Sequence, residues 1–243
     1  MSDFCSFSLI FFLDPPPHIF RDLPFPLTTF LFSAILILIN FYERSVRMQT
    51  VFLTVLKTDQ PGFPPENLFI QPSRQEKIRA LKTDEAKKSS LGVEAALRIT
   101  LTEAGFPADL RYRYTSPGQP VFDCPKLFIS LSHSGPYAVC ALSDKPVGVD
   151  VEQRRGVDGR LLKKILHPEE NEDDFFRIWT AKEAFFKQQG TGIVRPMKTL
   201  RVSKETVEDS ERGIRLFLYT EESGNASLAL CTEQPPDLRK IEL

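Results

Sequence analysis

Two acidic residues in the segment VGVDVE, residues 147–152, have the type and spacing for metal or proton chemistry. Residues two apart on a β-strand project to the same face, so Asp150 and Glu152 are expected to direct two carboxylates to one place. The alternating Val149 and Val151 then face the opposite way. Oxygen ligands without histidine favour Mg²⁺ over Zn²⁺, and a divalent cation would relieve the repulsion between the carboxylates. The segment alone leaves a surface or salt-bridged acidic pair equally open.

A second group of candidates lies in IWTAKEAFFKQQG, residues 178–190, which is typical of a helix. Glu183 and Lys187 are four residues apart and share one helical face, whereas Ile178 and Phe185 belong to a stripe suited to a core. An exposed ion pair on the helix surface is sufficient to explain Glu183 and Lys187. They could also provide a third oxygen ligand or proton acceptor, and a donor to phosphate oxygens.

The third candidate segment is LFISLSHSGPYAVCAL, residues 127–142. A strand is expected to end near Ser132, His133 and Ser134, before a Gly-Pro turn, and a histidine among hydroxyls can donate to an anion. A purely structural histidine is the alternative. No G-x-S-x-G elbow surrounds these serines, so the sequence gives no support to a nucleophilic hydrolase.

The composition excludes several classes of protein. The chain has 243 residues, of which 26% are charged and 42% hydrophobic, so it is not a disordered, collagen-like or polytopic membrane protein. Its formal net charge of -1 gives no general field for nucleic acid. The four cysteines form no C-x-x-C pair, which favours a reduced, cytoplasmic setting over a disulfide scaffold or zinc site.

Residues 1–47 differ from the rest of the chain. They are rich in phenylalanine, and residues 25–42 carry no charge, a length close to the minimum for crossing a bilayer. The acidic charges before this run do not fit a cleaved secretory signal. Two interpretations of these residues remain: a membrane anchor, or a translation start placed too early. We prefer the second because Met48 directly precedes a clear strand pattern.

From residue 48 onward the expected elements repeat in order: a strand, helices, then strands. The first series has a strand at 49–57, two helices within 73–103, and strands at 110–115, 127–131 and 137–142. The second has a strand at 147–152, helices at 158–166 and 172–189, and strands near 199–204, 213–220 and 226–232. This order predicts two α+β halves, residues 48–145 and 146–243, which bury their sheets against each other and leave a cleft at the seam.

Taken together and in this order, LSHSG, VGVDVE and WTAKEAFFKQQGTG resemble the 4'-phosphopantetheinyl transferases, especially the larger single-chain type that activates peptide and polyketide synthetases. The resemblance runs over residues 49–232, with weaker support from DEAKKSSLG and PGQP. It implies an α+β pseudo-dimer of two similar halves with the active site in the cleft between them. It also implies coenzyme A in that cleft, with Mg²⁺ bridging protein carboxylates and the pyrophosphate.

The resemblance also assigns roles to individual residues. Asp150, Glu152 and Glu183 stand where the family has its metal ligands. Ser132 and His133 match a phosphate-contacting pair, and Lys187 matches a lysine beside the pyrophosphate. Glu183 is additionally the candidate general base.

Two departures from the family concern the nucleotide. The family commonly has Gly-Lys-Pro where this chain has Gly118, Gln119 and Pro120, so a hydrogen-bond donor replaces a cation. In the helical region that usually offers basic groups to the 3'-phosphate, this chain has Thr83 where a further basic residue often lies. Lys88 is the expected contact there, with Arg79 or Lys82 as substitutes. Basic residues are frequent in this region. The alternative to a phosphate-binding patch is that they form a solvated helix face.

The resemblance implies a monomeric enzyme, and the cysteine usage places it in the cytoplasm. Its reaction would be the Mg²⁺-dependent transfer of 4'-phosphopantetheine from coenzyme A to a serine of an apo acyl or peptidyl carrier protein, with release of 3',5'-ADP. A catalytically inactive relative that binds coenzyme A or a carrier is the main alternative. A phosphohydrolase using the same carboxylates is a third. Neither nucleic acid nor, unless residues 1–47 are translated, a membrane is an expected partner.

Overall fold

A computed structural model describes residues 48–116, 118–124 and 126–242. The first part of the chain forms β1 (Gln49–Lys57), α2 (Pro72–Arg79), α3 (Asp84–Glu103), β2 (Tyr112–Tyr114), β3 (Pro120–Phe122), β4 (Phe128–Ser134) and β5 (Tyr137–Ser143). The second part forms β6 (Val147–Gln153), α4 (Gly159–Ile165), the 3₁₀ turn η1 (Glu172–Asp174), α5 (Phe175–Gln189), the 3₁₀ turn η2 (Met197–Thr199), β7 (Arg201–Val202), β8 (Thr206–Asp209), β9 (Ile214–Ser223), β10 (Ala226–Thr232) and β11 (Pro236–Glu242).

The two parts build their sheets with the same topology. The six-stranded sheet has the order β11-β1-β5-β4-β3-β2, and the five-stranded sheet has the order β6-β10-β9-β8-β7. In the first sheet, β1 precedes the helices and lies beside β5, and β4, β3 and β2 follow outward. In the second sheet, β6 precedes the helices and lies beside β10, and β9, β8 and β7 follow outward in the same way. This confirms the α+β fold of two similar halves.

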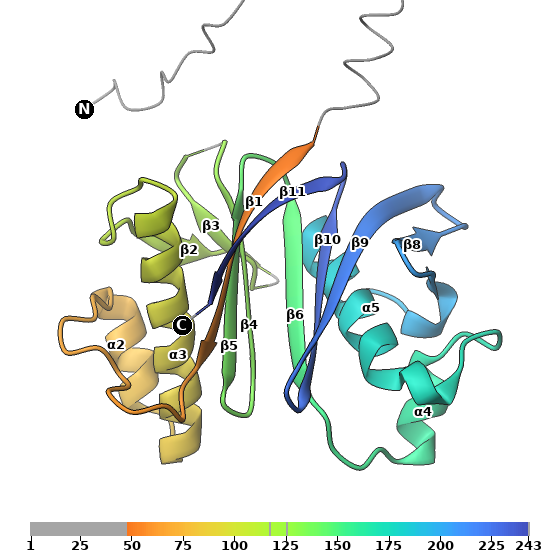
Figure 1. Ribbon diagram of the computed structural model, residues 1–243, viewed down its shortest axis with the longest axis horizontal. Coiled ribbons are helices and arrows are strands. Elements are labelled where there is room, and N and C mark those ends of the chain that lie inside the picture. Colours follow the sequence, from red (N-terminus) through yellow and green to blue (C-terminus); the bar gives the residue numbers. More distant parts are fainter. Residues whose placement is uncertain (1–47, 117, 125, 243) are drawn as a thin grey trace, which may run out of the picture. The chain divides into compact units, whose positions relative to one another are not determined.

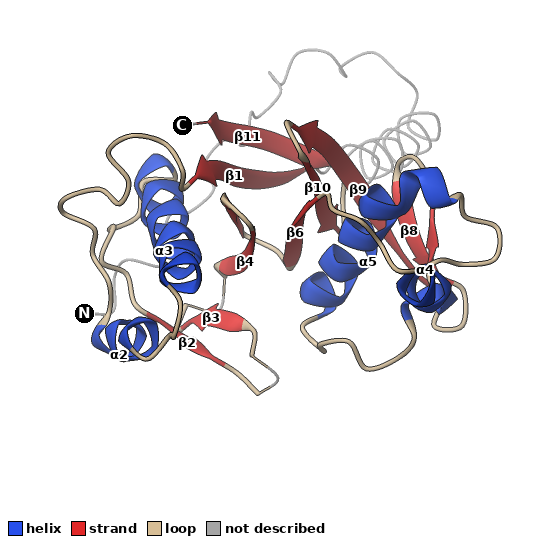
Figure 2. Cartoon of the chain, turned by 90° about the horizontal axis from the view of Figure 1, so that it is seen from below, coloured by secondary structure: helices blue, strands red, loops and turns tan. Residues whose placement is uncertain are grey.

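The two sheets face each other (Figures 1 and 2), and an apolar layer lies between them. Side chains from β1, β5, β6 and β10 form it, including Val51, Val139, Val149 and Leu228, all of which are fully or nearly fully buried. Burying each such side chain stabilises the fold by about 1.5–3 kcal/mol. The α3 helix covers the other face of the first sheet, and α4 and α5 cover the other face of the second.

The local sequence explains where the principal helices begin and end. Thr83 caps α3 by accepting a hydrogen bond from the backbone N–H of Ala86. The α5 helix buries the expected stripe of Ile178 and Phe185 and ends at Gly190, whose φ of 65° is in the left-handed region that glycine adopts without strain.

The last strand departs from the expected division at residues 145 and 146. Residues 236–242 form β11, which pairs in parallel with β1 and therefore extends the first sheet. The short strands β3 and β8 also lie outside the expected elements. Most of the other elements agree with their expected ranges to within a few residues, and β1 and β10 agree at both ends.

The hypotheses about residues 1–47, an anchor or an incorrect start, concern a segment outside the described residues. Among the residues that are described, no helix combines the length and the apolar character needed to cross a membrane.

Candidate active site

A glycine on β6 brings this strand into close contact with α5. A Cβ atom at Gly148 would lie 1.9 Å from the carbonyl oxygen of Ala184 and 2.4 Å from the backbone nitrogen of Gln188. Only glycine permits this approach, since any larger residue would overlap the helix backbone. The contact fixes the position of α5, which carries Glu183 and Lys187, beside the strand that carries Asp150.

The two faces of β6 are divided as its alternation predicts. Val149 and Val151 point into the apolar layer between the sheets. Asp150 and Glu152 point the other way, and Asp150 is 4% exposed. A carboxylate this deeply buried requires hydrogen bonds or opposite charge.

Hydroxyl groups of β4 connect it to β6 in place of a backbone ladder. Ser130 accepts from the Val149 N–H at 2.9 Å. Ser132 donates to Asp150 Oδ1 at 2.7 Å, and Ser134 donates to Glu152 Oε2 at 2.9 Å. The two acidic side chains of the second half are therefore held by two serines of the first half.

Asp150 uses only one of its two oxygens. Lys187 Nζ lies 2.8 Å from Oδ1, the atom that also accepts from Ser132. Oδ2 is buried and has no hydrogen-bond partner. An unpaired buried carboxylate oxygen is costly, so this atom is suited to a ligand that the protein itself does not provide.

Arg155 and the side chain of Trp179 link the carboxylates of Glu152 and Glu183. Arg155 Nη1 lies 3.2 Å from Glu152 Oε2, and its guanidinium lies over the ring of Trp179. Trp179 Nε1 in turn donates to Glu183 Oε1 at 3.4 Å. Sequence reasoning identified neither Arg155 nor Trp179 as a functional residue, because their contacts join residues that have no regular spacing.

The acidic residues also affect one another electrostatically. Burial, followed by the negative charge of Asp150, raises the pKa of Glu152 above its ordinary value. Burial and the same charge raise the pKa of Glu183, although Lys187 opposes this effect. The three carboxylates therefore belong to one field of negative charge, in which a cation would be stabilised.

The geometry is nevertheless not that of a finished metal centre. Among the described residues, no three His, Cys, Asp or Glu side chains are grouped closely enough to hold a metal ion as they stand. The chemistry of Asp150, Glu152 and Glu183 fits a hard cation, because they offer only oxygen donors and include the unpaired Oδ2 of Asp150.

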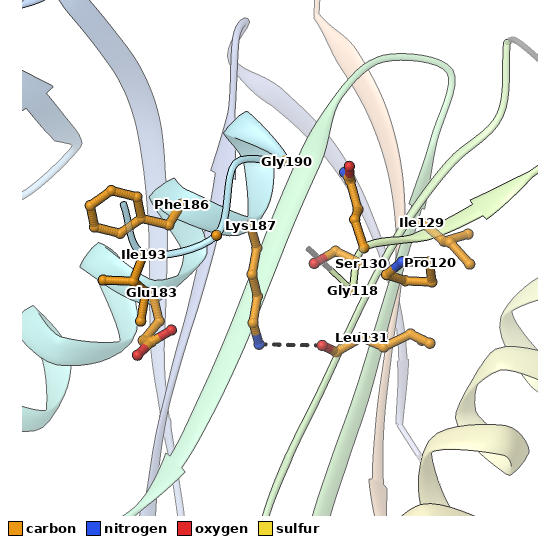
Figure 3. Close-up of a pocket in the computed structure, with 12 residues that line it drawn as sticks. Gly118, Pro120, Ile129, Ser130, Leu131, Glu183, Phe186, Lys187, Gly190 and Ile193 are labelled. Carbon is orange, nitrogen blue, oxygen red and sulfur yellow. Dashed lines mark hydrogen bonds between the residues drawn. The ribbon is translucent and has the colours of Figure 1, made fainter. Parts of the chain in front are cut away.

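A pocket of about 300 Å³ lies beside these carboxylates (Figure 3). Glu183, Phe186 and Lys187 of α5 line one side, and residues of β3 and β4 line the other. Lys187 spans it, with its Nζ 3.2 Å from the carbonyl oxygen of Leu131. Both halves of the chain therefore contribute to this pocket.

Gln119 and Pro120 line the same pocket, as do Gly118 and Gly190. A Cβ atom at Gly190 would lie 2.4 Å from Oε1 of Gln119, so this glycine makes room for the glutamine side chain. The segment around Gln119 thus lies opposite the end of α5.

A neighbouring pocket of about 270 Å³ contains His133, Ser132, Arg74 and Ser90. Desolvation, followed by the positive charges of Lys187 and Arg74, lowers the pKa of His133. The imidazole is therefore neutral near pH 7, and it can donate one hydrogen bond without contributing a fixed charge.

Arg74 is a lining residue that sequence reasoning did not single out. Its Nε lies 2.8 Å from Oε1 of the fully buried Glu94, and Glu94 also accepts from Tyr112 at 2.6 Å. This anchoring holds the α2 guanidinium at the pocket. The sequence showed Arg74 only as one of several basic residues.

Lys88, the expected 3'-phosphate contact, is exposed on α3 and is not among the residues that line either pocket. A cation near His133 comes from Arg74 instead. Lys88 stays a prediction, because an exposed lysine side chain has a long reach.

Comparisons with known proteins indicate the family of this chain. Residues 146–231, which contain β6 and α5, match the model of the 4'-phosphopantetheinyl transferase superfamily. The chain is 26% identical over 162 residues to the 4'-phosphopantetheinyl transferase Sfp of Bacillus subtilis (strain 168), covering 59% of this chain and 72% of that protein.

Similarity also extends over both halves. The transferase ffp of Bacillus subtilis is 27% identical over 187 residues, covering 69% of this chain and 84% of its own length. The chain belongs to the 4'-phosphopantetheinyl transferase superfamily. AcpT of Escherichia coli, which carries the same enzyme name, is 32% identical over 138 residues, covering 50% of this chain and 66% of its own. The expectation of a phosphopantetheinyl transferase enzyme of the single-chain type is thereby confirmed.

Proposed function

We propose that this phosphopantetheinyl transferase moves the 4'-phosphopantetheine group of coenzyme A to a serine hydroxyl of an apo acyl or peptidyl carrier protein, and releases 3',5'-ADP. The observation that carries the proposal is the pocket between the two halves, which Glu183 and Lys187 line and in which Lys187 is bound to the buried carboxylate of Asp150. This combination suits a substrate whose reacting group is a pyrophosphate, because acidic and basic groups are both needed there.

The basic side chains support a polyphosphate ligand. Lys187 has three donors, of which Asp150 and the Leu131 carbonyl take two, so one remains for a pyrophosphate oxygen. Arg74 and His133 line the adjoining pocket and would hold the more distant 3'-phosphate. A bound phosphate would favour the protonated form of His133.

Asp150, Glu152 and Glu183 would hold Mg²⁺, with Oδ2 of Asp150 as the oxygen that has no other partner. When bound, this ion would withdraw charge from the pyrophosphate oxygens. Lys187 keeps Oδ1 of Asp150 occupied and so leaves Oδ2 available.

The group transfer forms one bond and breaks another. The serine oxygen of the carrier attacks the β-phosphorus of coenzyme A and forms a new P–O bond, while the P–O bond to 3',5'-ADP breaks and its electron pair stays with the nucleotide. Glu183 accepts the serine proton, directly or through a water molecule. Its raised pKa makes it a better proton acceptor than an ordinary glutamate.

We also propose that the enzyme works as a monomer in the cytoplasm. One chain provides both walls of the pocket, so a second copy is not needed to complete it. The buried thiols of Cys140 and Cys231 suit a reducing compartment.

Mass spectrometry tests the reaction. The full chain is incubated with coenzyme A, Mg²⁺ and an apo carrier protein, and with the same carrier in which the acceptor serine is changed to alanine. We expect a phosphopantetheine adduct and stoichiometric 3',5'-ADP with the serine carrier and neither product with the alanine carrier. Release of nucleotide with both carriers would indicate a hydrolase and contradict the proposal, as would no adduct on any carrier tested.

A further inference from the structure

Arg155, immediately beyond β6, lies against the acidic residues without being one of the expected site residues. Its Nη1 lies 3.2 Å from Oε2 of Glu152 and 3.5 Å from the carbonyl oxygen of Gln153. Its guanidinium carbon lies 5.4 Å from the centre of the Trp179 ring. Arg155 thus contacts Glu152 directly and the indole that donates to Glu183.

These contacts place a positive charge where the proposed metal ion would bind. Two of the three donors of Lys187 are used by Asp150 and the Leu131 carbonyl, so Lys187 balances the charge of Asp150. Glu152 receives a hydroxyl from Ser134 and the charge of Arg155. Each of the two carboxylates on β6 therefore has its own side-chain cation.

The two cations differ in how easily they can move away. The side chain of Lys187 is 30% exposed and holds the carboxylate of Asp150, whose side chain is 6% exposed. The side chain of Arg155 is 55% exposed and that of Glu152 is 18% exposed, so the arginine side of this ion pair faces water. A solvent-exposed arginine is held weakly by one such contact, so a competing divalent cation can replace it.

We propose that Arg155 is a resident counter-cation of the acidic site, which a divalent cation displaces from Glu152, and that Arg155 thereby sets the affinity of the site for metal. This inference rests on the proposed function, because it takes Asp150, Glu152 and Glu183 as the metal-binding residues. A divalent ion and the guanidinium repel each other, and both compete for the same oxygen of Glu152. Removing Arg155 therefore strengthens metal binding.

The adjacent arginine provides a matched control. Arg154 carries the same charge and is also partly exposed, but it pairs with Glu222 and donates its backbone N–H to Asn225. Changing either arginine to glutamine alters the net charge of the protein equally. A difference between Arg155→Gln and Arg154→Gln therefore reports the local contact with the acidic site.

Binding of Mn²⁺, followed by the electron paramagnetic resonance of free ion, tests the proposal with the full chain. Coenzyme A is present in every sample, and Asp150→Asn serves as the site control. We expect Arg155→Gln to lower the Mn²⁺ Kd about fivefold, or about 1 kcal/mol. Arg154→Gln should stay within about twofold of the wild type, and Asp150→Asn should lose the site.

Each result has a definite meaning. Mn²⁺ binding that depends on Asp150 but is no tighter in Arg155→Gln than in Arg154→Gln overturns the role of Arg155 and leaves the proposed function intact. Absence of any Asp150-dependent Mn²⁺ binding overturns the metal site, and this inference with it. The carrier-labelling reaction is measured separately, so failure of the transfer activity is distinguished from both results.

Trp179, the only tryptophan in the sequence, gives an independent measurement. Addition of Mg²⁺ in the presence of coenzyme A should change its fluorescence in the wild type, because the guanidinium leaves the indole ring. In Arg155→Gln the emission should already differ before Mg²⁺ is added and should respond less. An identical Mg²⁺ response in both proteins would contradict displacement of Arg155.

Discussion

Lys187 on α5 and Asp150 on β6 are joined by a hydrogen bond of 2.8 Å between Nζ and Oδ1. The bond connects the helix and the strand that carry the acidic residues, and it leaves Oδ2 of Asp150 without a partner. One ion pair thus both positions the lysine at the pocket and keeps a buried oxygen free. We expect Lys187 to stabilise the transition state, in which negative charge on the pyrophosphate is redistributed.

Changing Lys187 to alanine should therefore lower kcat about a hundredfold, with a smaller effect, below about tenfold, on the dissociation constant of coenzyme A. Steady-state kinetics and calorimetric binding separate these quantities. Lys198→Ala, which removes an exposed lysine from η2, is the control and should leave both unchanged. Equal losses in kcat and binding would show that Lys187 acts only by holding the substrate.

Gly148 should be required for the contact between β6 and α5. Because a Cβ atom would lie 1.9 Å from the Ala184 carbonyl oxygen, Gly148→Ala should reduce the free energy of unfolding by about 2 kcal/mol or more. Gly156→Ala, at a position where a Cβ atom meets nothing within 4 Å, should change it by less than about 0.5 kcal/mol. Chemical denaturation measures both variants. Equal stability of the two would mean that α5 moves away from β6 at no cost.

The affinity for 3',5'-ADP should rise as the pH falls from 7.5 toward 6. The pKa of His133 in the free protein is lowered by desolvation and by Lys187 and Arg74, so the ring is neutral at the start of this range. A bound phosphate favours the imidazolium, so the complex takes up a proton and binding strengthens on acidification. Calorimetry in buffers of different ionisation enthalpy measures this proton uptake.

His133→Asn should remove the proton uptake while retaining a hydrogen-bond donor. Phosphate groups of the nucleotide also titrate in this range, so the difference between wild type and variant is the decisive quantity. The same proton uptake in both proteins would exclude His133 as the group that responds to phosphate.

Lys182 should be important for stability although it precedes the proposed base. It is fully buried, and its Nζ donates to the Ile165 carbonyl at 2.9 Å and to Glu170 Oε2 at 2.5 Å. Glu170 also accepts from the backbone N–H of Val202, which ties β7 to the same cluster. Lys182→Met leaves a buried carboxylate without its cation and should cost about 3–5 kcal/mol.

The double variant Lys182→Met with Glu170→Gln should be more stable than Lys182→Met alone, because the unpaired charge is removed. Thermal and chemical unfolding measure this difference. If the double variant is the less stable of the two, the loss in Lys182→Met does not come from an unpaired Glu170.

Local patterns were sufficient to predict most of the fold. The alternation in residues 147–152 correctly separated the two faces of β6, and the helical spacing of Ile178 and Phe185 identified the buried side of α5. Strand β11 could not be predicted in this way, because its sequence PDLRKIE lacks an apolar alternation and its pairing partner β1 lies at the opposite end of the described chain. Strands β3 and β8 are short and rely on neighbouring strands in the same manner.

The candidate site was predictable only where its residues lie within one element. Spacing along β6 and α5 placed Asp150 with Glu152 and Glu183 with Lys187, but it could not give their contacts across the two elements. Arg155, just beyond the end of β6, contacts the ring of Trp179 on α5, and no sequence period predicts this contact.

Arg74 was equally difficult to predict, since its position depends on the buried Glu94 of α3. The two residues come from different helices, and neither belongs to the segments that carry the family resemblance most strongly. Long-range ion pairs of this kind are set by tertiary packing rather than by local spacing.

The most direct test of the central claim is a crystal structure of the full chain with coenzyme A and Mg²⁺. We expect one ion beside the pyrophosphate, bound by Asp150 Oδ2, Glu152 and Glu183 at about 2.1 Å. An ion held without Asp150, or Glu183 remaining out of reach of an ion bound to Asp150 and Glu152, would contradict the account.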